Sequence, residues 1–103
     1  MKIVAVTACP TGIAHTYMAA EALENAAKKL GHWIKVETQG SIGIENKITQ
    51  SEANDADLVI FAADVAVKEE KRFKNKPIYR AEAQKAIKNA KSVIEEALKM
   101  VES

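Results

Sequence analysis

Two uninterrupted apolar runs constrain the fold of this chain more than any other feature of its sequence. Residues 3–6 read IVAV, and residues 58–62 read LVIFA. Neither run alternates with polar residues, which is typical of strands that are buried on both faces inside a parallel sheet. We therefore predict two central strands, one over residues 2–7 and the other over residues 58–62.

A helix and a weaker strand are predicted between these two runs. Residues 13–30 are rich in Ala, Glu, Leu and Lys with apolar residues at helical spacing, and Gly31 supplies a stop signal. Residues 32–38 then alternate, as expected of an edge strand with one wetter face. One face carries Ile34, Val36 and Thr38, and the wetter face carries Trp33, Lys35 and Glu37.

The remaining segments are assigned by their turn and helix signals. Residues 39–48 contain two glycines and no periodicity, so we read them as a loop, and a capping box then begins a short helix at residues 49–55. Residues 65–76 are polar and basic, with room for one helical turn. Residues 77–80 allow only a short edge strand, because they begin with proline. Apolar residues at helical spacing predict one long helix over residues 83–101.

The alternation of strands and helices indicates an α/β fold with a parallel sheet. Right-handed crossovers and the two apolar central strands favour the strand order 2-1-3-4. We therefore predict a Rossmann-like open four-stranded parallel sheet with helices on both faces, in a single domain over residues 1–103. Ligands of such sheets bind at the carboxyl ends of the strands where the chain reverses direction, here between strands one and three. Cys9 directly follows the first strand.

Composition and charge narrow the classes of function. The chain has 103 residues with 48% hydrophobic and 28% charged residues, which suits a single domain with one core. Its formal charge of +1 gives no global field that would attract nucleic acid or an anionic membrane. One cysteine allows neither an internal disulfide nor a multi-cysteine zinc site, which suits a reducing cytosolic compartment. The apolar runs are too short for a signal-peptide core or a membrane span, so we expect neither.

The lone cysteine lies between the first strand and the first helix, in the sequence TACPTGIAHTYMAA. A loop that leads into a helix presents unpaired N–H groups and the positive end of the helix dipole, which together form an anion site and favour a thiolate. Gly12 allows the backbone to approach an anion closely, and Pro10 stiffens the loop. The hydroxyls of Thr11 and Thr16 add donors, although Thr16 is equally suited to cap the helix. We predict that Cys9 holds a phosphoryl group there.

The spacing of this loop is similar to that of phosphatase loops, but the parts for hydrolysis are missing. Cys9 and Thr16 match the pattern C-x-x-x-x-x-R-S/T, whereas His15 stands where a phosphatase has arginine. An imidazole cannot replace the bidentate guanidinium fork, and neither proline follows an Asp that could act as general acid. The residues therefore favour a nucleophile that holds a phosphoryl group for another acceptor. A phosphatase or arsenate-reductase-like enzyme, a non-catalytic anion-binding regulatory module and an inert buried thiol remain the alternatives.

Three strings carry a resemblance to a known family over essentially the whole chain: TACPTGIAHTYMAAEAL, VETQGSIGIEN and ADLVIFAAD. The chain resembles the enzyme IIB component, fructose class, of the bacterial phosphoenolpyruvate-dependent sugar phosphotransferase system (PTS). The resemblance implies a single fructose-like (type-2) IIB domain in which Cys9 becomes phosphocysteine. It also implies a phosphoryl-binding loop that consists of Pro10, Thr11, Gly12, Ile13, Ala14, His15 and Thr16.

The same resemblance implies partners and a place in the cell. Cys9 is expected to accept a phosphoryl group from a phosphohistidine of enzyme IIA and to pass it to the sugar that the membrane enzyme IIC transports. We expect fructose as this sugar, with mannose or another fructose-like sugar as the alternatives. We expect no cofactor, no metal and no nucleic-acid partner. We further expect a cytoplasmic monomer that meets the inner membrane only through enzyme IIC.

Several further residues lie where they can contact the loop or a partner. His15 can bond the phosphoryl group, tune Cys9 or simply complete the loop. Residues 39–43 and Asp64 follow strands at the same edge of the sheet. They can either contact the cysteine loop or a partner, or simply connect one element to the next, as a turn residue at the end of a strand does. A basic run is expected to be a solvated face, with an acidic partner as the alternative; it comprises Lys68, Lys71, Arg72, Lys74 and Lys76.

Overall fold

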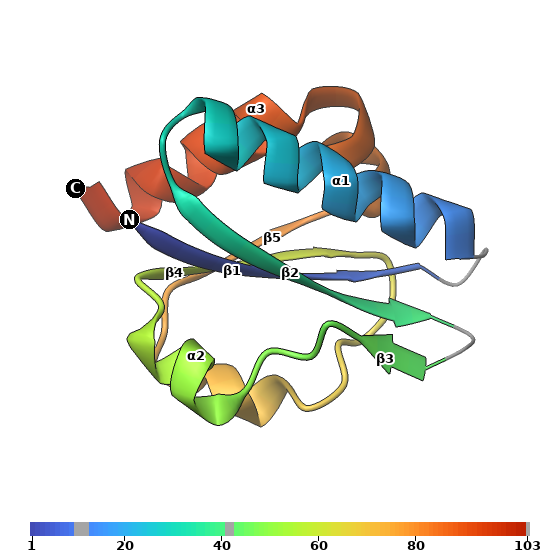
Figure 1. The fold of residues 1–103 in the computed structure, drawn as a ribbon, viewed down its shortest axis with the longest axis horizontal. Coiled ribbons are helices and arrows are strands. Elements are labelled where there is room, and N and C mark those ends of the chain that lie inside the picture. The colour runs from blue at the N-terminus through green and yellow to red at the C-terminus, as the bar shows by residue number, and fades with distance from the viewer. Residues whose placement is uncertain (10–12, 41–42, 103) are drawn as a thin grey trace.

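The computed structural model describes residues 1–9, 13–40 and 43–102, which form a central sheet between two layers of helices (Figure 1). The order of the strands across the sheet is β3-β2-β1-β4-β5. Along the chain the elements are β1 (Lys2–Ala8), α1 (Ile13–Lys29), β2 (Trp33–Gly40), β3 (Gly43–Glu45), α2 (Gln50–Asp55), β4 (Leu58–Ala63), the 3₁₀-helix η1 (Glu70–Phe73), β5 (Ile78–Ala81) and α3 (Ala83–Glu102).

The sheet differs from the predicted one by a short additional strand. β1 pairs in parallel with β2 and β4, and β4 pairs in parallel with β5, so the predicted order 2-1-3-4 is confirmed for these strands. β3 pairs antiparallel with β2, so the described residues form a mixed sheet of five strands, and β2 is not its edge. A strand of three residues is too short to show alternation. Gly43, at φ +109°, takes a backbone conformation that favours glycine.

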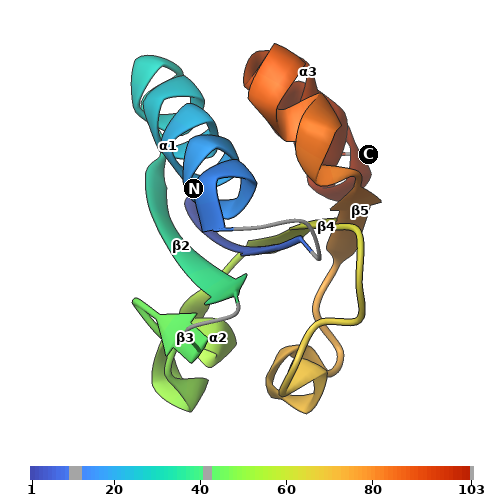
Figure 2. The same ribbon diagram turned by 90° about the vertical axis from the view of Figure 1, so that its right-hand side faces the viewer.

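Helices cover both faces of the sheet, as predicted. α1 and α3 lie on one face, and α2 and η1 lie on the other (Figure 2). Side chains of β1 alternate between two buried clusters: Ile3 and Ala5 pack with residues of α1 and α3, whereas Val4 and Val6 pack with Phe61 on the other side. The central strands are therefore buried on both faces, which explains their unbroken apolar runs.

The helices on the two faces begin and bend at identifiable residues. Glu52 N donates a hydrogen bond to Thr49 Oγ1 (3.1 Å) and Thr49 N donates to Glu52 Oε1 (2.9 Å), so the predicted capping box begins α2. η1 is the helical turn for which the sequence leaves room. α3 is bent, since Asn89 has φ −150° and ψ 63° and its side-chain oxygen accepts a hydrogen bond from Ser92 N (3.2 Å). The continuous apolar face of α3 gives no sign of this bend.

The carboxyl ends of β1, β2 and β4 meet at one edge of the sheet, on the right-hand side of Figure 1. Ala8, the last residue of β1, is aligned with Gln39 of β2 and with Ala63 of β4. Asp64 N then donates a hydrogen bond to Ala8 O (2.9 Å). Cys9 comes next in the chain, so the fold brings the cysteine to this edge between the ends of two neighbouring strands.

Candidate functional site

Cys9 lies at the carboxyl end of β1, where the strand pattern predicts it, with 9% of its surface exposed. The Nδ1 atom of His15, in the first turn of α1, lies 4.0 Å from Cys9 Sγ. α1 begins at Ile13 and has 17 residues, so the N-terminus of a long helix follows the cysteine closely in the chain. The first N–H groups of a helix have no intrahelical partner and lie at the positive end of its dipole. The site therefore combines a cysteine thiol with a helix terminus that favours anions.

The predicted phosphoryl-binding loop is described only in its second half. Pro10, Thr11 and Gly12 lie outside the described residues. Ala14 and His15 belong to the first turn of α1 and are exposed. The later residues of the predicted loop therefore form the start of the helix.

Thr16 lies on the side of α1 that faces the sheet, and 2% of it is exposed. Its carbonyl oxygen accepts a hydrogen bond from Thr7 Oγ1 of β1 (3.1 Å). The Thr16 hydroxyl is buried and has no hydrogen-bond partner among the described residues. Because α1 begins at Ile13, Thr16 lies inside the helix, and its interpretation as the helix cap is wrong. A buried hydroxyl without a partner is uncommon and costs stability, and this one lies in the first turn of the helix next to Cys9.

Asp64 and part of the basic run make structural contacts within the protein. Asp64 Oδ1 accepts a hydrogen bond from Ala83 N (3.2 Å), at the first residue of α3. In the basic run, Lys76 Nζ donates hydrogen bonds to backbone carbonyls at the end of α2 (2.6 and 2.9 Å), and Arg72 is buried. The expectation of one solvated basic face is therefore wrong for Lys76 and Arg72, whereas Lys68 and the other two lysines are exposed.

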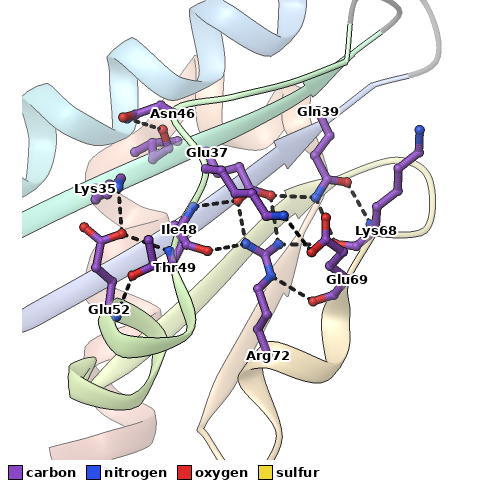
Figure 3. A network of polar contacts seen from close by, with 12 residues as sticks. Lys35, Glu37, Gln39, Asn46, Ile48, Thr49, Glu52, Lys68, Glu69 and Arg72 are labelled. Carbon is purple, nitrogen blue, oxygen red and sulfur yellow. Dashed lines mark hydrogen bonds and ion pairs between the residues drawn. The ribbon is translucent and has the colours of Figure 1, made fainter.

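A buried polar network joins β2 to η1, and the sequence does not reveal it (Figure 3). Glu37, which alternation places on the wetter face, is fully buried. Its carboxylate accepts hydrogen bonds from Arg72 Nη1 (2.6 Å) and Nη2 (2.9 Å), Gln39 Nε2 (2.7 Å) and Ile48 N (2.8 Å). Alternation gives the face on which Glu37 lies, but it cannot show that Ile48 and η1 cover that face.

The contacts in this network keep both of its charged groups ionised. Burial alone raises the pKa of the Glu37 carboxyl, but the hydrogen bonds from Arg72, Gln39 and Ile48 outweigh it and hold the pKa below its usual 4.5. The hydrogen bonds with Glu37 raise the pKa of the Arg72 guanidinium despite its burial. Arg72 also donates to the carbonyls of Ile48 (2.7 Å), Glu69 (2.9 Å) and Lys68 (3.3 Å). All of its N–H groups are therefore used within the protein.

The described residues provide neither a membrane span nor a metal cluster. None of their helices has the length and the apolar character needed to cross a bilayer. No three or more of their His, Cys, Asp or Glu side chains gather as metal ligands would.

Comparison with known sequences identifies the family. The family model described as "PTS system, Lactose/Cellobiose specific IIB subunit" matches residues 4–96. The chain is 55% identical over 93 residues to the PTS system fructose-like EIIB component 2 of Escherichia coli (strain K12), an alignment that covers 90% of this chain and 88% of the relative. It is also 54% identical over 97 residues to the PTS system fructose-specific EIIB'BC component of the same strain, covering 94% of this chain but 17% of that longer protein.

Solved structures agree with this assignment. A domain from the fructose-specific IIABC component of Borrelia burgdorferi superposes with a TM-score of 0.90 at 54% identity, covering 95% of this chain and 93% of that one. The predicted fructose-specific IIB of Escherichia coli superposes with a TM-score of 0.93 at 30% identity, covering 99% of this chain and 90% of that one. The chain therefore belongs to the enzyme IIB family of the bacterial sugar phosphotransferase system, as a phosphotransferase component with fructose-type relatives.

Proposed function

We propose that this protein is a phosphoryl carrier that works through phosphocysteine at Cys9. The phosphoryl donor is a phosphohistidine of enzyme IIA, and the acceptor is a sugar, with fructose as the expected substrate, held by the membrane enzyme IIC. The observation that carries the proposal is the position of Cys9, which ends the central strand β1 directly before the N-terminus of α1. The fructose-type names of the similar proteins support the choice of sugar.

The first transfer needs a nucleophile and a place for the transferred group. The Cys9 thiolate attacks phosphorus in line, so that an S–P bond forms while the N–P bond to the donor histidine breaks, and the histidine keeps the electron pair. We propose that residues 10–16 then hold the phosphoryl oxygens. The N–H groups at the start of α1 and the helix dipole favour the negative charge. The buried Thr16 hydroxyl is a further donor, and a phosphoryl oxygen gives it the partner that it lacks among the described residues.

The second transfer needs positioning more than a new catalytic group. A sugar hydroxyl attacks the phosphocysteine, so that an O–P bond forms, the S–P bond breaks and sulfur leaves as thiolate. Phosphoryl transfer of this kind depends mainly on alignment and on stabilisation of charge. We assign the base that takes the proton of the sugar hydroxyl to the partner. His15 Nδ1, 4.0 Å from Cys9 Sγ, is placed to contact the transferred group.

The arrangement of the arginines favours relay over hydrolysis. A phosphatase of this loop type clamps its substrate with a guanidinium. The chain has two arginines, Arg72 and Arg80. Arg72 uses its donors on Glu37 and on backbone carbonyls, and Arg80 pairs with Glu70. Neither is assigned to a phosphate at Cys9.

The proposal is tested by transferring phosphate to the protein. The wild type and Cys9→Ser are each incubated with phosphorylated fructose-type enzyme IIA, and tandem mass spectrometry locates the added phosphoryl group. We expect one phosphoryl group on Cys9 of the wild type and none on the variant. Labelling of Cys9→Ser as strong as that of the wild type would falsify the proposal. Steady hydrolysis of an aryl phosphate without any partner would instead identify a phosphatase.

A further inference from the structure

Residues 64–68, which lead from β4 toward η1, connect the carboxyl ends of three strands, and we call this segment the arch. At its first residue, Asp64 N donates a hydrogen bond to Ala8 O (2.9 Å). At its last residue, Lys68 is bonded to the side chain of Gln39. Gln39 is in turn aligned with Ala8 across the sheet. The arch is therefore bonded at one end to Ala8, the residue directly before Cys9, and at the other end to Gln39, the residue of β2 that is aligned with Ala8.

Gln39 holds the end of the arch with both atoms of its amide. Its Oε1 accepts a hydrogen bond from Lys68 N (2.8 Å), and its Nε2 donates to Lys68 O (3.0 Å). The side chain thereby bonds to Lys68 as a neighbouring strand would. Gln39 is 6% exposed although Lys68 is at the surface, so water has little access to the amide.

The buried ion pair fixes the orientation of this amide. Gln39 Nε2 also donates to Glu37 Oε2 (2.7 Å), and Glu37 is held by Arg72. Arg72 Nη2 shares the same acceptor on the arch, Lys68 O (3.3 Å). A flip of the Gln39 amide would bring its oxygen against the Glu37 carboxylate, so the charged pair allows one orientation only. Figure 3 shows Gln39 between Glu37 and Lys68.

We propose that Gln39 is a positioning residue for phosphoryl transfer, which acts by locking the arch against the end of β1 and so fixing the backbone that carries Cys9. The proposal rests on the proposed function of Cys9 as phosphoryl carrier. Gln39 does not bond to the transferred group itself. Its effect passes through Lys68, Asp64 and Ala8 to the attachment point of the thiol.

Loss of the hydrogen bonds between Gln39 and Lys68 is expected to reduce the rate of phosphoryl transfer and not the affinity for the donor. In-line transfer requires the sulfur within a narrow range of position, and a misplacement of about 1 Å can cost roughly 100-fold in rate. Removal of the Gln39 amide leaves the exposed surface around Cys9 unchanged in composition. We therefore expect kcat for phosphorylation of Cys9 to fall by about 10-fold or more, with KM for enzyme IIA nearly unchanged.

The test compares Gln39→Met with Gln50→Met. Gln50 Nε2 also donates to a backbone carbonyl of η1, Arg72 O (3.0 Å), and to Asn54 Oδ1 (2.9 Å), but it lies in α2, away from the arch. The same substitution at this exposed position therefore removes hydrogen bonds of a glutamine amide, one of them to a backbone carbonyl, but none to the arch itself. Gln39→Asn is a second variant, which keeps the amide but is too short to bond to both backbone groups of Lys68. All are assayed below their unfolding transitions.

Two measurements are made on each variant. The first is the dependence of Cys9 phosphorylation on the concentration of phosphorylated enzyme IIA, which separates kcat from KM. The second needs no phosphate: the rate at which iodoacetamide alkylates Cys9. We expect Gln39→Met and Gln39→Asn to be alkylated several-fold faster than the wild type, because the thiol is only 9% exposed and a backbone that is held less firmly lets the reagent reach it more often. We expect Gln50→Met to behave as the wild type does in both assays.

The outcomes separate the two proposals. If the wild type is phosphorylated at Cys9 and Gln39→Met has the same kcat and the same alkylation rate, the positioning role is wrong. A fall in kcat that Gln50→Met shares equally also overturns it, because the effect is then one of general stability. If the wild type takes no phosphoryl group, the proposed function fails, and the role of Gln39 in transfer fails with it.

Discussion

Replacement of Arg72 by methionine tests the energetic weight of the buried ion pair. The substitution keeps an unbranched apolar stem but removes the guanidinium that bonds to Glu37, Ile48, Glu69 and Lys68. Glu37 is 0% exposed and keeps only its hydrogen bonds from Gln39 and Ile48 N. Breaking a buried pair in this way costs about 3–5 kcal/mol, since it leaves an uncompensated charge.

That cost is large against the roughly 5–15 kcal/mol that holds a typical domain folded. Urea unfolding followed by far-UV circular dichroism measures it. With an m-value of about 1–3 kcal/mol per molar urea, the midpoint of Arg72→Met is expected to fall by about 1 M or more. The partly exposed pair of Lys35 and Glu52 provides the control, because Lys35→Met removes a solvent-accessible bridge worth about 1 kcal/mol at most.

A double-mutant cycle separates the lost ion pair from lost packing. Glu37→Leu combined with Arg72→Met removes both charges, so we expect the double variant to be more stable than Arg72→Met alone. The reasoning is refuted if Arg72→Met loses no more stability than Lys35→Met. It is refuted as well if the double variant loses the sum of the two single losses.

Three further predictions concern acid stability, helix capping and the buried hydroxyl. The pKa of Glu37 is lowered in the folded state, so the ionised carboxylate contributes fully to the free energy of unfolding above about pH 4.5, and this contribution is lost as the pH falls through the folded pKa. In urea titrations from pH 5 down to pH 3, the free energy of unfolding of Glu37→Gln is therefore expected to fall less steeply than that of the wild type. Thr49→Ala removes the capping box of α2 and is expected to cost about 1 kcal/mol, measured by urea unfolding. Thr16→Val replaces a buried hydroxyl that lacks a partner among the described residues, so the free energy of unfolding of the variant is expected to equal or exceed that of the wild type while phosphorylation of Cys9 slows. Slower phosphorylation together with a lower free energy of unfolding would contradict this prediction.

The sequence predicts most of the fold because its strongest signals are local. The runs at residues 3–6 and 58–62 are unbroken because their strands are covered on both faces, and Thr49 with Glu52 begins α2 through contacts within one turn. β3 is not predictable in the same way, because three residues are too few to show periodicity. The bend of α3 at Asn89 is not predictable either, because the apolar residues keep their helical spacing across it.

In the site, too, the sequence predicts what depends on neighbouring residues and misses what depends on contacts between distant ones. The position of Cys9 follows from the end of one strand and the start of the next helix, which are adjacent in the chain. The pairing of Glu37 with Arg72 and of Gln39 with Lys68 joins residues far apart in sequence. Alternation separates Glu37 from Val36 and Thr38, but it does not show that Glu37 is buried, and the sequence assigns Gln39 to a loop although it lies in β2. What covers these residues depends on how the later segments return to the sheet.

The relay through Cys9 is tested most directly by following the phosphoryl group in time. Protein labelled by phosphorylated enzyme IIA is mixed with membranes that contain fructose-type enzyme IIC and with fructose, and samples are quenched at intervals. We predict that phosphate on Cys9 disappears at the same rate as fructose phosphate appears, in equal amounts, and that Cys9→Ser supports neither signal. Formation of fructose phosphate with Cys9→Ser, or its appearance while the label on Cys9 persists undiminished, would contradict the account.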